Sequence, residues 1–289
     1  MNRECMTTQP SACDSAREVR ERYRRCYERI ADDDLIKPLE SHKHIRNIPF
    51  LRMIGDVRGK RVLDVGSSQG LLLDQLKAAE LTVCVDLASA YLQVARGNGH
   101  QVVVADGEAL SFRPGSFDVV ICSGVLEHVL DAEAVIRQSE QVLAPHGKLV
   151  VLVPWEEDLQ KYATCEGTYE FTHLRSFNDE VVRKLFRGFR VIRRRGVEPK
   201  VERPPNFKLL EALPRFVTSL FRLAGIDSLE EWFGRHIPWR IRNRYWKWYW
   251  RQLERFPEWD WLWLWFYPPN HMVFVLEPRE AQGGSEGQA

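Results

Sequence analysis

Apolar residues along this chain gather in short runs, separated by stretches in which they recur every three or four positions. Short runs bounded by Gly, Asp or Pro are typical of buried strands, and the longer period is typical of helices. The runs predict strands over residues 61–65, 81–85, 101–105, 117–122, 147–153, 189–194 and 271–276. The periodic stretches predict helices over residues 16–31, 35–54, 71–79, 88–96, 131–143 and 179–186, with Asp14 or Ser15 capping the first and Asn178 the last. Strands that alternate with helices indicate a parallel α/β sheet.

A glycine-containing turn follows the first predicted strand, in the stretch RVLDVGSSQG (residues 61–70). Gly66 can adopt backbone angles closed to other residues, and it lets a ligand approach the main chain. A strand, a glycine turn and a helix form the first unit of a parallel sheet, where ligands bind at the carboxyl ends of the strands. Counted from Gly66, the dinucleotide pattern G-x-G-x-x-G fails at two of its three glycines. The pattern acidic-x-G-x-G-x-G, from Asp64 to Gly70, departs only at Ser68.

That spacing resembles motif I of the class I S-adenosylmethionine (SAM)-dependent methyltransferases. The stretch SFDVVICSGVLEHV (residues 116–129) is similar to the type 11 small-molecule methyltransferases of the quinone-biosynthesis kind, and LAPHGKLVV (residues 143–151) to their hairpin into strand five. The matches cover roughly residues 58–153, with a weaker similarity to residue 194. The resemblance implies a Rossmann-like class I sheet, mostly parallel with the last strand antiparallel. N-terminal helices and a helical Trp-rich insertion before the last strand would complete it.

The resemblance implies that SAM is bound at the carboxyl ends of the first four strands. Asp86 could accept both ribose hydroxyls, as the acidic residue of nucleotide-binding sheets does, and Leu87 would face adenine. Asp106 would accept from the adenine amino group. An alternative is that each acid only caps the following helix. The expected cofactor-binding residues are Asp64, Gly66, Ser67, Ser68, Gly70, Asp86, Leu87, Asp106, Gly107 and Ser123.

Methyl transfer from SAM is an in-line displacement, in which the enzyme mainly aligns the reactants and excludes water. A general base is needed only where the acceptor loses a proton, as a hydroxyl does. His128 is the first candidate base, with Glu127 beside it, and His173 is the second. Alternatively, Glu127 and His128 hold their loop together and His173 anchors the turn before a helix. Arg175 would meet an anionic acceptor group or a local carboxylate.

The amino-acid composition narrows the classes of protein and the cellular locations that remain. The formal net charge of +1 over 289 residues argues against a protein that binds polyanions as a whole. The six cysteines are scattered, without a C-x-x-C pair, so we expect a reducing compartment and no metal ligands. Cys84 and Cys122 fall in apolar runs and are expected to be buried thiols. The first residues lack an apolar leader segment, and no apolar run is long enough to span a bilayer, so we expect a cytoplasmic protein, soluble or peripheral at a membrane.

Nine of the ten tryptophans lie in residues 232–265. Drawn as a helix, residues 239–255 place most of their Trp and Tyr side chains on one side and most of their Arg and Lys on the other. An aromatic face opposite a basic face is typical of a helix that lies in a membrane interface. A lid or dimer contact, with arginines stacked on tryptophans, is an alternative. Nucleic acid ranks last, because the near-zero net charge supplies no wider basic surface.

These patterns together predict an organisation and a function. The expected segments are a disordered tail (1–13), a helical cover (14–57), a SAM-binding core (58–198), the insertion (199–270), the last core strand (271–278) and a disordered tail (279–289). We expect a SAM-dependent methyltransferase that acts on an oxygen of a small apolar or lipid-linked acceptor at a membrane surface. The alternatives are a soluble methyltransferase of a sugar, natural product or RNA, and a non-catalytic SAM-binding scaffold. The oligomeric state stays open.

Overall fold

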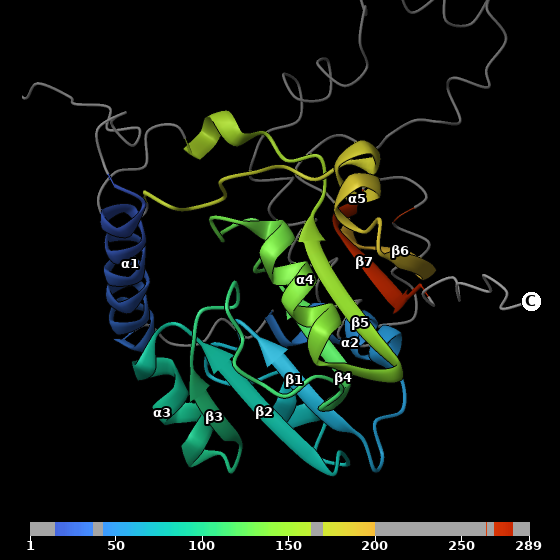
Figure 1. The fold of residues 1–289 in the computed structure, drawn as a ribbon. Helices are drawn as coiled ribbons and strands as arrows, with labels where there is room; N and C mark the ends of the chain where they lie inside the picture. The colour runs from blue at the N-terminus through green and yellow to red at the C-terminus, as the bar shows by residue number, and fades with distance from the viewer. Residues whose placement is uncertain (1–14, 37–42, 163–169, 200–263, 265–268, 280–289) are drawn as a thin grey trace, which may run out of the picture. The chain divides into compact units, whose positions relative to one another are not determined.

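A seven-stranded sheet forms the centre of the protein, in the order β3-β2-β1-β4-β5-β7-β6 (Figure 1). The structure is a computed structural model, and it describes residues 15–36, 43–162, 170–199, 264 and 269–279. The strands are β1 (Arg61–Val65), β2 (Leu81–Asp86), β3 (Gln101–Val104), β4 (Phe117–Ser123), β5 (Leu143–Pro154), β6 (Phe189–Pro199) and β7 (Pro269–Pro278). The first five pair in parallel, and β7 runs opposite to β5. The predicted sheet, mostly parallel with its last strand antiparallel, is confirmed.

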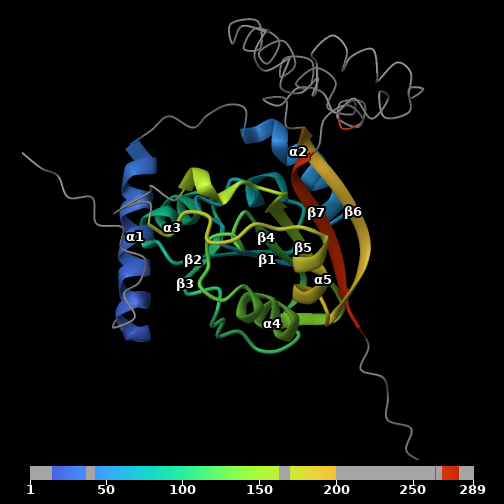
Figure 2. The same ribbon diagram turned by 90° about the horizontal axis from the view of Figure 1, so that it is seen from above.

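The helices follow the predicted alternating pattern, except at residues 71–79. They are α1 (Ala16–Ile36), α2 (Lys43–Ile54), α3 (Ser89–Gly97), α4 (Ala132–Val142) and α5 (Asp179–Leu185). Helix α3 packs on β2 and β3 and also contacts α1, while α4 contacts β5 and α5. Figure 2 shows α4 and α5 together on one side of the sheet and α1 beside α3.

The helix starts follow the capping residues in the sequence. The backbone N–H of Glu18 donates to Ser15 Oγ at 3.3 Å, and that of Ser15 donates to a Glu18 carboxylate oxygen at 2.8 Å, which is a capping box. Asn178 caps α5 by accepting from two backbone N–H groups, as predicted. Helix α1 continues past the predicted end to Ile36, and α2 begins only at Lys43. Pro38 lies between them, and the residues before a proline are disfavoured in a helix.

The predicted helix over residues 71–79 is wrong. This stretch contains only turns and a short 3-10 helix, Leu73–Gln75. The backbone N–H groups of Gln75 and Leu76 bond three residues back, so the turn is tighter than an α-helix. The Asp74 carboxylate is also hydrogen-bonded to the side chains of Asn98 and His100. The glycine turn therefore does not open an α-helix whose N-terminus could bind an anion.

The central strands are apolar on both faces, as expected for parallel strands covered by helices. Cys84 and Cys122 lie fully buried in β2 and β4 as free thiols, as predicted. In the register, Val65 of β1 lies opposite both Val85 of β2 and Cys122 of β4. The carboxyl ends of these strands therefore meet at one edge of the sheet, which is where ligands bind in such folds.

The chain divides into two compact units. The first comprises residues 1–39, 53–194 and 273–289, and the second comprises residues 40–52 and 195–272. Few residues of the second unit are described. Among them, His271 Nδ1 lies 2.8 Å from a Glu198 carboxylate oxygen. The predicted terminal tails, apart from Arg279, and nearly all of the predicted insertion lie outside the described residues, so those expectations stay predictions.

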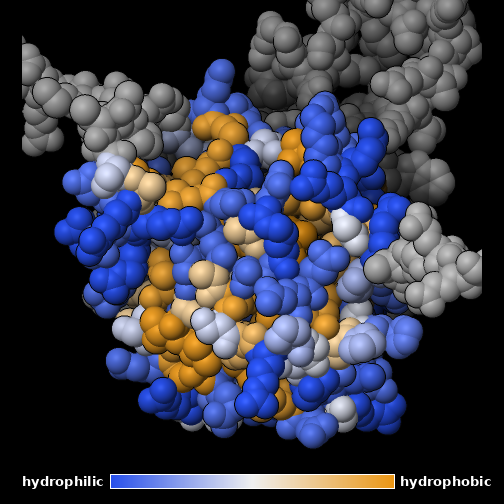
Figure 3. All heavy atoms as spheres, in the orientation of Figure 1, coloured by the Kyte–Doolittle hydropathy of each residue, from blue (hydrophilic) through white to orange (hydrophobic). Residues whose placement is uncertain are grey.

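Polar and charged residues cover most of the face drawn in Figure 3, with smaller apolar patches between them. The exposed apolar side chains include Val103 and Val104 of the edge strand β3. In the part of the chain that the structure describes, no helix combines the length and the apolarity needed to cross a membrane.

Candidate functional site

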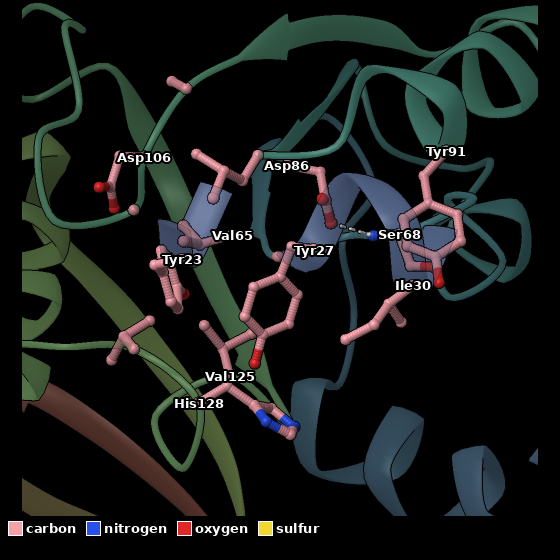
Figure 4. Close-up of a pocket in the computed structure, with 16 residues that line it drawn as sticks. Tyr23, Tyr27, Ile30, Val65, Ser68, Asp86, Tyr91, Asp106, Val125 and His128 are labelled. Carbon is pink, nitrogen blue, oxygen red and sulfur yellow. Dashed lines mark hydrogen bonds between the residues drawn. The ribbon is translucent and has the colours of Figure 1, made fainter. Parts of the chain in front are cut away.

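A pocket lies at the carboxyl ends of the central strands (Figure 4). Six of the residues expected to bind the cofactor line it: Gly66, Ser68, Asp86, Leu87, Asp106 and Gly107. Asp64, Ser67, Gly70 and Ser123 lie outside its lining. Of the three candidate catalytic residues, His128 lines the pocket, whereas Glu127 and His173 do not. The rest of the lining is Tyr23, Tyr27, Ile30, Val65, Tyr91, Ala105, Gly124, Val125 and Val129.

Gly66 and Ser68 form the turn that borders the pocket, and both have positive φ. Gly66 has φ of 70°, and a Cβ there would meet the Val125 side chain at 2.3 Å, so only glycine fits. Ser68 has φ of 50°, which L-residues with a side chain adopt at a cost in energy. The one departure from the glycine pattern therefore falls where glycine would relieve strain.

The Asp86 carboxylate joins this turn to the start of α3. One oxygen accepts the backbone N–H of Ser68 at 2.8 Å (Figure 4). The other accepts the backbone N–H of Ala88 at 2.9 Å. Burial raises the pKa of Asp86, and backbone N–H groups lower it. Asp86 bonds to the backbone N–H of the residue before α3 and not to one inside its first turn, so it does not cap this helix as the alternative expects. Its carboxylate lines the pocket, where each oxygen keeps a lone pair for a ribose hydroxyl.

Asp64 lies one strand position before the turn and is buried inside β1, at 3% exposure. Burial, with a smaller contribution from the Asp86 charge, raises the pKa of Asp64 to about 8. Asp64 is therefore mostly protonated at neutral pH. The acidic position of the glycine pattern lies behind the pocket.

Asp106 and helix α1 close the opposite side of the pocket. Asp106 accepts the backbone N–H of Glu108, and Arg20 of α1 reaches both acids, at 3.3 Å and 2.9 Å. Tyr23, Tyr27 and Ile30 of α1 face the pocket (Figure 4). They belong to the predicted first helix, whose apolar periodicity does not distinguish a core contact from a ligand contact. The expected helical cover over residues 14–57 was the signal for them.

The segment after β4 carries Glu127 and His128. Residues 126–130 form turns and bends, in which the His128 N–H donates to the Val125 carbonyl at 2.9 Å. Burial, followed by the nearby charge of His173, lowers the pKa of His128 to about 4. The rings of His128 and His173 lie 4.7 Å apart.

Glu127, His128 and His173 bring one possible metal-ligand atom each within 4.8 Å of one another. Spacing along the sequence gave no sign of this group, because His173 lies far from the other two in the chain. The expectation that the chain holds no metal ligands stays a prediction.

Among the described residues Arg175 binds no carboxylate, and it is not part of the pocket lining. Its guanidinium donates to the backbone carbonyls of Leu126, Val129 and Leu130. Burial lowers the pKa of Arg175. Arg175 thus ties the segment around His173 to the turn that carries His128.

Comparisons with known proteins agree with this geometry. Residues 63–151 match the family model described as "Methyltransferase domain", of type 11. These residues are a class I SAM-dependent methyltransferase domain. The chain is 38% identical over 122 residues to the ubiquinone biosynthesis O-methyltransferase of Xanthomonas euvesicatoria, and this match covers 39% of this chain and 50% of the relative. The same enzyme of Idiomarina loihiensis is 37% identical, covering 40% of this chain and 51% of the relative. The chain spans about half the length of the curated relatives it matches.

Two solved methyltransferases share the fold. The 1,6-didemethyltoxoflavin-N1-methyltransferase of Burkholderia thailandensis, solved with S-adenosylhomocysteine, has a TM-score of 0.51 at 18% identity and covers 65% of this chain and 85% of its own. A SAM-dependent methyltransferase of Archaeoglobus fulgidus has a TM-score of 0.50 at 17% identity, over 82% and 94%. The methyltransferase domain of this chain has residues that fit SAM: a turn with glycine at position 66, two strand-end carboxylates and an apolar wall.

Replacing Ser68 by glycine should relieve the strain at the turn. We expect Ser68→Gly to keep the N–H bond to Asp86 and to raise the free energy of unfolding by up to about 1 kcal/mol. Ser68→Val should lower it, because a β-branched residue tolerates positive φ poorly. Thermal unfolding of the three proteins tests this; equal stability of the two variants would show that Ser68 is unstrained.

Replacing Asp86 by asparagine should weaken cofactor binding. The change removes one charged acceptor while keeping the shape, so affinity for S-adenosylhomocysteine should fall by about 10- to 100-fold. Titration calorimetry measures this. Glu80→Gln, which likewise replaces a carboxylate by an amide but at an exposed position, is the matched control and should bind as the wild type does. Unchanged affinity in Asp86→Asn would remove Asp86 from the site.

The buried Asp64 should make stability depend on pH. Its pKa in the folded state, about 8, lies above the ordinary value, so its contribution to stability is complete below about pH 4 and is lost as the pH rises through 8. Asp64→Asn cannot ionise. The stability of this variant relative to the wild type should therefore increase by up to about 1.4 kcal/mol per pH unit between pH 5 and 8 and then level off. Denaturant unfolding across this range checks it; parallel curves would mean that Asp64 titrates normally.

Proposed function

We propose that this chain binds SAM and transfers its methyl group to an oxygen of a small apolar or lipid-linked acceptor at a membrane surface. The observation that carries the proposal is the meeting of Asp86, Asp106 and His128 around one pocket, from three separate strand ends. A structural role for each residue alone would not require them to face the same space. The names of the O-methyltransferase relatives support oxygen as the acceptor atom.

The pocket residues would hold the cofactor by distinct contacts. Asp86 would accept the ribose hydroxyls, Leu87 would contact adenine, and Asp106 would accept from the adenine amino group. The Gly66 turn would let the amino acid end approach the backbone. SAM, when bound, supplies a methyl carbon activated by a positive sulfur.

The chain's own residues would then align the acceptor and exclude water, which are the main requirements of methyl transfer. Helix α1 contributes the buried Tyr23 and the half-buried Tyr27 to one wall. Burial raises the pKa of both phenols above the ordinary tyrosine value, so neither side chain places a phenolate in the pocket. The positive methyl donor would therefore face the carboxylates at the strand ends and no competing phenolate.

The proposed membrane surface rests on the sequence of residues 199–270, where aromatic and basic side chains alternate with helical spacing. Such a segment could bring the pocket to a lipid-linked acceptor without a membrane-spanning helix. The second candidate, a soluble acceptor with this segment as a lid, keeps the same cofactor site.

Transfer of a labelled methyl group from SAM into whole host-cell extract, followed by partition between organic and aqueous phases, tests the proposal. We expect label in the organic phase, because the proposed acceptor is apolar. Label in the aqueous phase alone would contradict the membrane acceptor and favour sugars, soluble metabolites or RNA.

The Asp86→Asn variant serves as the control for this assay, because its labelling should fall with its cofactor affinity. Normal binding of S-adenosylhomocysteine without any labelling would contradict the enzyme and favour a non-catalytic SAM-binding protein.

A further inference from the structure

The two histidines beside the pocket differ in their partners. His128 lines the pocket, and its buried Nδ1 has no hydrogen-bond partner among the described residues. His173 lies behind it, and its Nδ1 is hydrogen-bonded to a carboxylate oxygen of Glu157. The His173 and Glu157 side chains are only 17% and 12% exposed, so water does not replace this contact freely.

The carboxylate of Glu157 is itself held in place. While Oε2 meets His173, Oε1 accepts the hydroxyl of Tyr162 at 3.0 Å. The Tyr162 ring also lies 4.7 Å from the His173 ring. Both carboxylate oxygens are thus engaged, which fixes the plane of the carboxylate and with it the orientation of the imidazole.

The three segments that carry these side chains are joined by hydrogen bonds. The backbone N–H of Leu174 donates to the Glu127 carbonyl at 2.6 Å, next to the three carbonyls held by Arg175. The backbone N–H of Glu157 donates to Ser176 Oγ at 3.0 Å, and that of Glu156 donates to the Phe177 carbonyl at 2.8 Å. Side chains on a cross-linked frame of this kind keep their mutual geometry when a ligand binds.

His173 also has a backbone conformation that is costly for its residue type, with φ of 45°. Such a conformation persists only where the surroundings impose it, and it is found preferentially at functional sites. A residue needed only to anchor a turn could be glycine or asparagine at this position, without the strain.

We propose that Glu157 is a positioning residue that holds His173 through Nδ1, so that His173 Nε2 takes the proton of the acceptor hydroxyl. This inference rests on the proposed function. The cofactor would fill the pocket as far as His128, so the acceptor must approach from beyond it, where His173 lies. His128, which has no carboxylate partner in the described structure, would stay neutral beside the reacting atoms.

The proposed step balances. The acceptor oxygen forms a bond to the methyl carbon, and the carbon–sulfur bond breaks with its electron pair going to sulfur. The hydroxyl proton passes to His173 Nε2, giving an imidazolium whose charge the adjacent Glu157 carboxylate compensates. The proton then leaves to water, and the products are a methyl ether and S-adenosylhomocysteine.

Nuclear magnetic resonance of protein labelled with ¹⁵N-histidine tests the pairing without cofactor or acceptor. We expect His173 to carry its proton on Nδ1, with a strongly downfield proton resonance because the partner is a carboxylate. Glu157→Gln should move that resonance upfield, and His173→Gln should remove it. Glu156→Gln, the same change at the neighbouring exposed position, should leave it in place. A His173 whose Nδ1 is unprotonated in the wild type would overturn the proposal.

Kinetics with SAM and catechol as the probe acceptor test the proton transfer. We expect Glu157→Gln and His173→Gln each to lower kcat by about 100-fold, with KM for SAM within about twofold of the wild type, while Glu156→Gln stays unchanged. A structural role alone would instead change KM and stability together. Full kcat in either variant would overturn the base role.

Two further outcomes would also overturn it. If a chelator abolishes wild-type turnover and a divalent cation alone restores it, His173 is a metal ligand together with Glu127 and His128, and another group accepts the proton. If the wild type labels neither catechol nor cell extract, the proposed function fails and the base role fails with it, even where the resonance data show the pair.

Discussion

The Asp86 carboxylate connects two parts of the chain that the sheet alone would leave independent. By accepting the N–H groups of Ser68 and Ala88, it fixes the turn after β1 relative to the start of α3. These bonds are possible because β1 and β2 run in parallel and end at the same edge. The same edge receives Asp106 from β3 and His128 from the segment after β4, so the pocket is a product of strand register.

The features that arise from local chemistry could be predicted from the sequence. Apolar runs identified every strand, and short polar side chains identified the starts of α1 and α5. Gly66 and Asp86 could be assigned because a tight turn and a strand-end carboxylate each need a particular residue type at a fixed distance from a strand. The turns at residues 71–79 were missed because apolar periodicity carries no information on the hydrogen bonds that join Asp74 to Asn98 and His100.

Contacts between segments that lie far apart in the chain could not be predicted from the sequence. Nothing near Glu157 marks it as a partner of His173, because the pair depends on how the exits of β5 and the segment before α5 are joined. Arg175 was expected to meet an anion, yet its guanidinium donates to backbone carbonyls. Every residue type has a backbone carbonyl, so the sequence does not mark these acceptors. Asp64 was expected in the pocket because the pattern names it, while its burial follows from the position of β1 in the centre of the sheet, where both faces are covered.

Helix α1 forms one wall of the pocket but lies outside the stretch that identifies the methyltransferase domain. The residues that identify the family therefore differ from those that would distinguish this chain from other members. The stretch that matches the methyltransferase family, residues 63–151, contains the turn, Asp86 and His128. It contains neither the tyrosines of α1 nor Glu157 and His173. Two proteins with the same family match could thus share a cofactor and differ in every side chain beyond its methyl group. Sorting such proteins by the substrates they accept would require comparing the segments on either side of the matched domain.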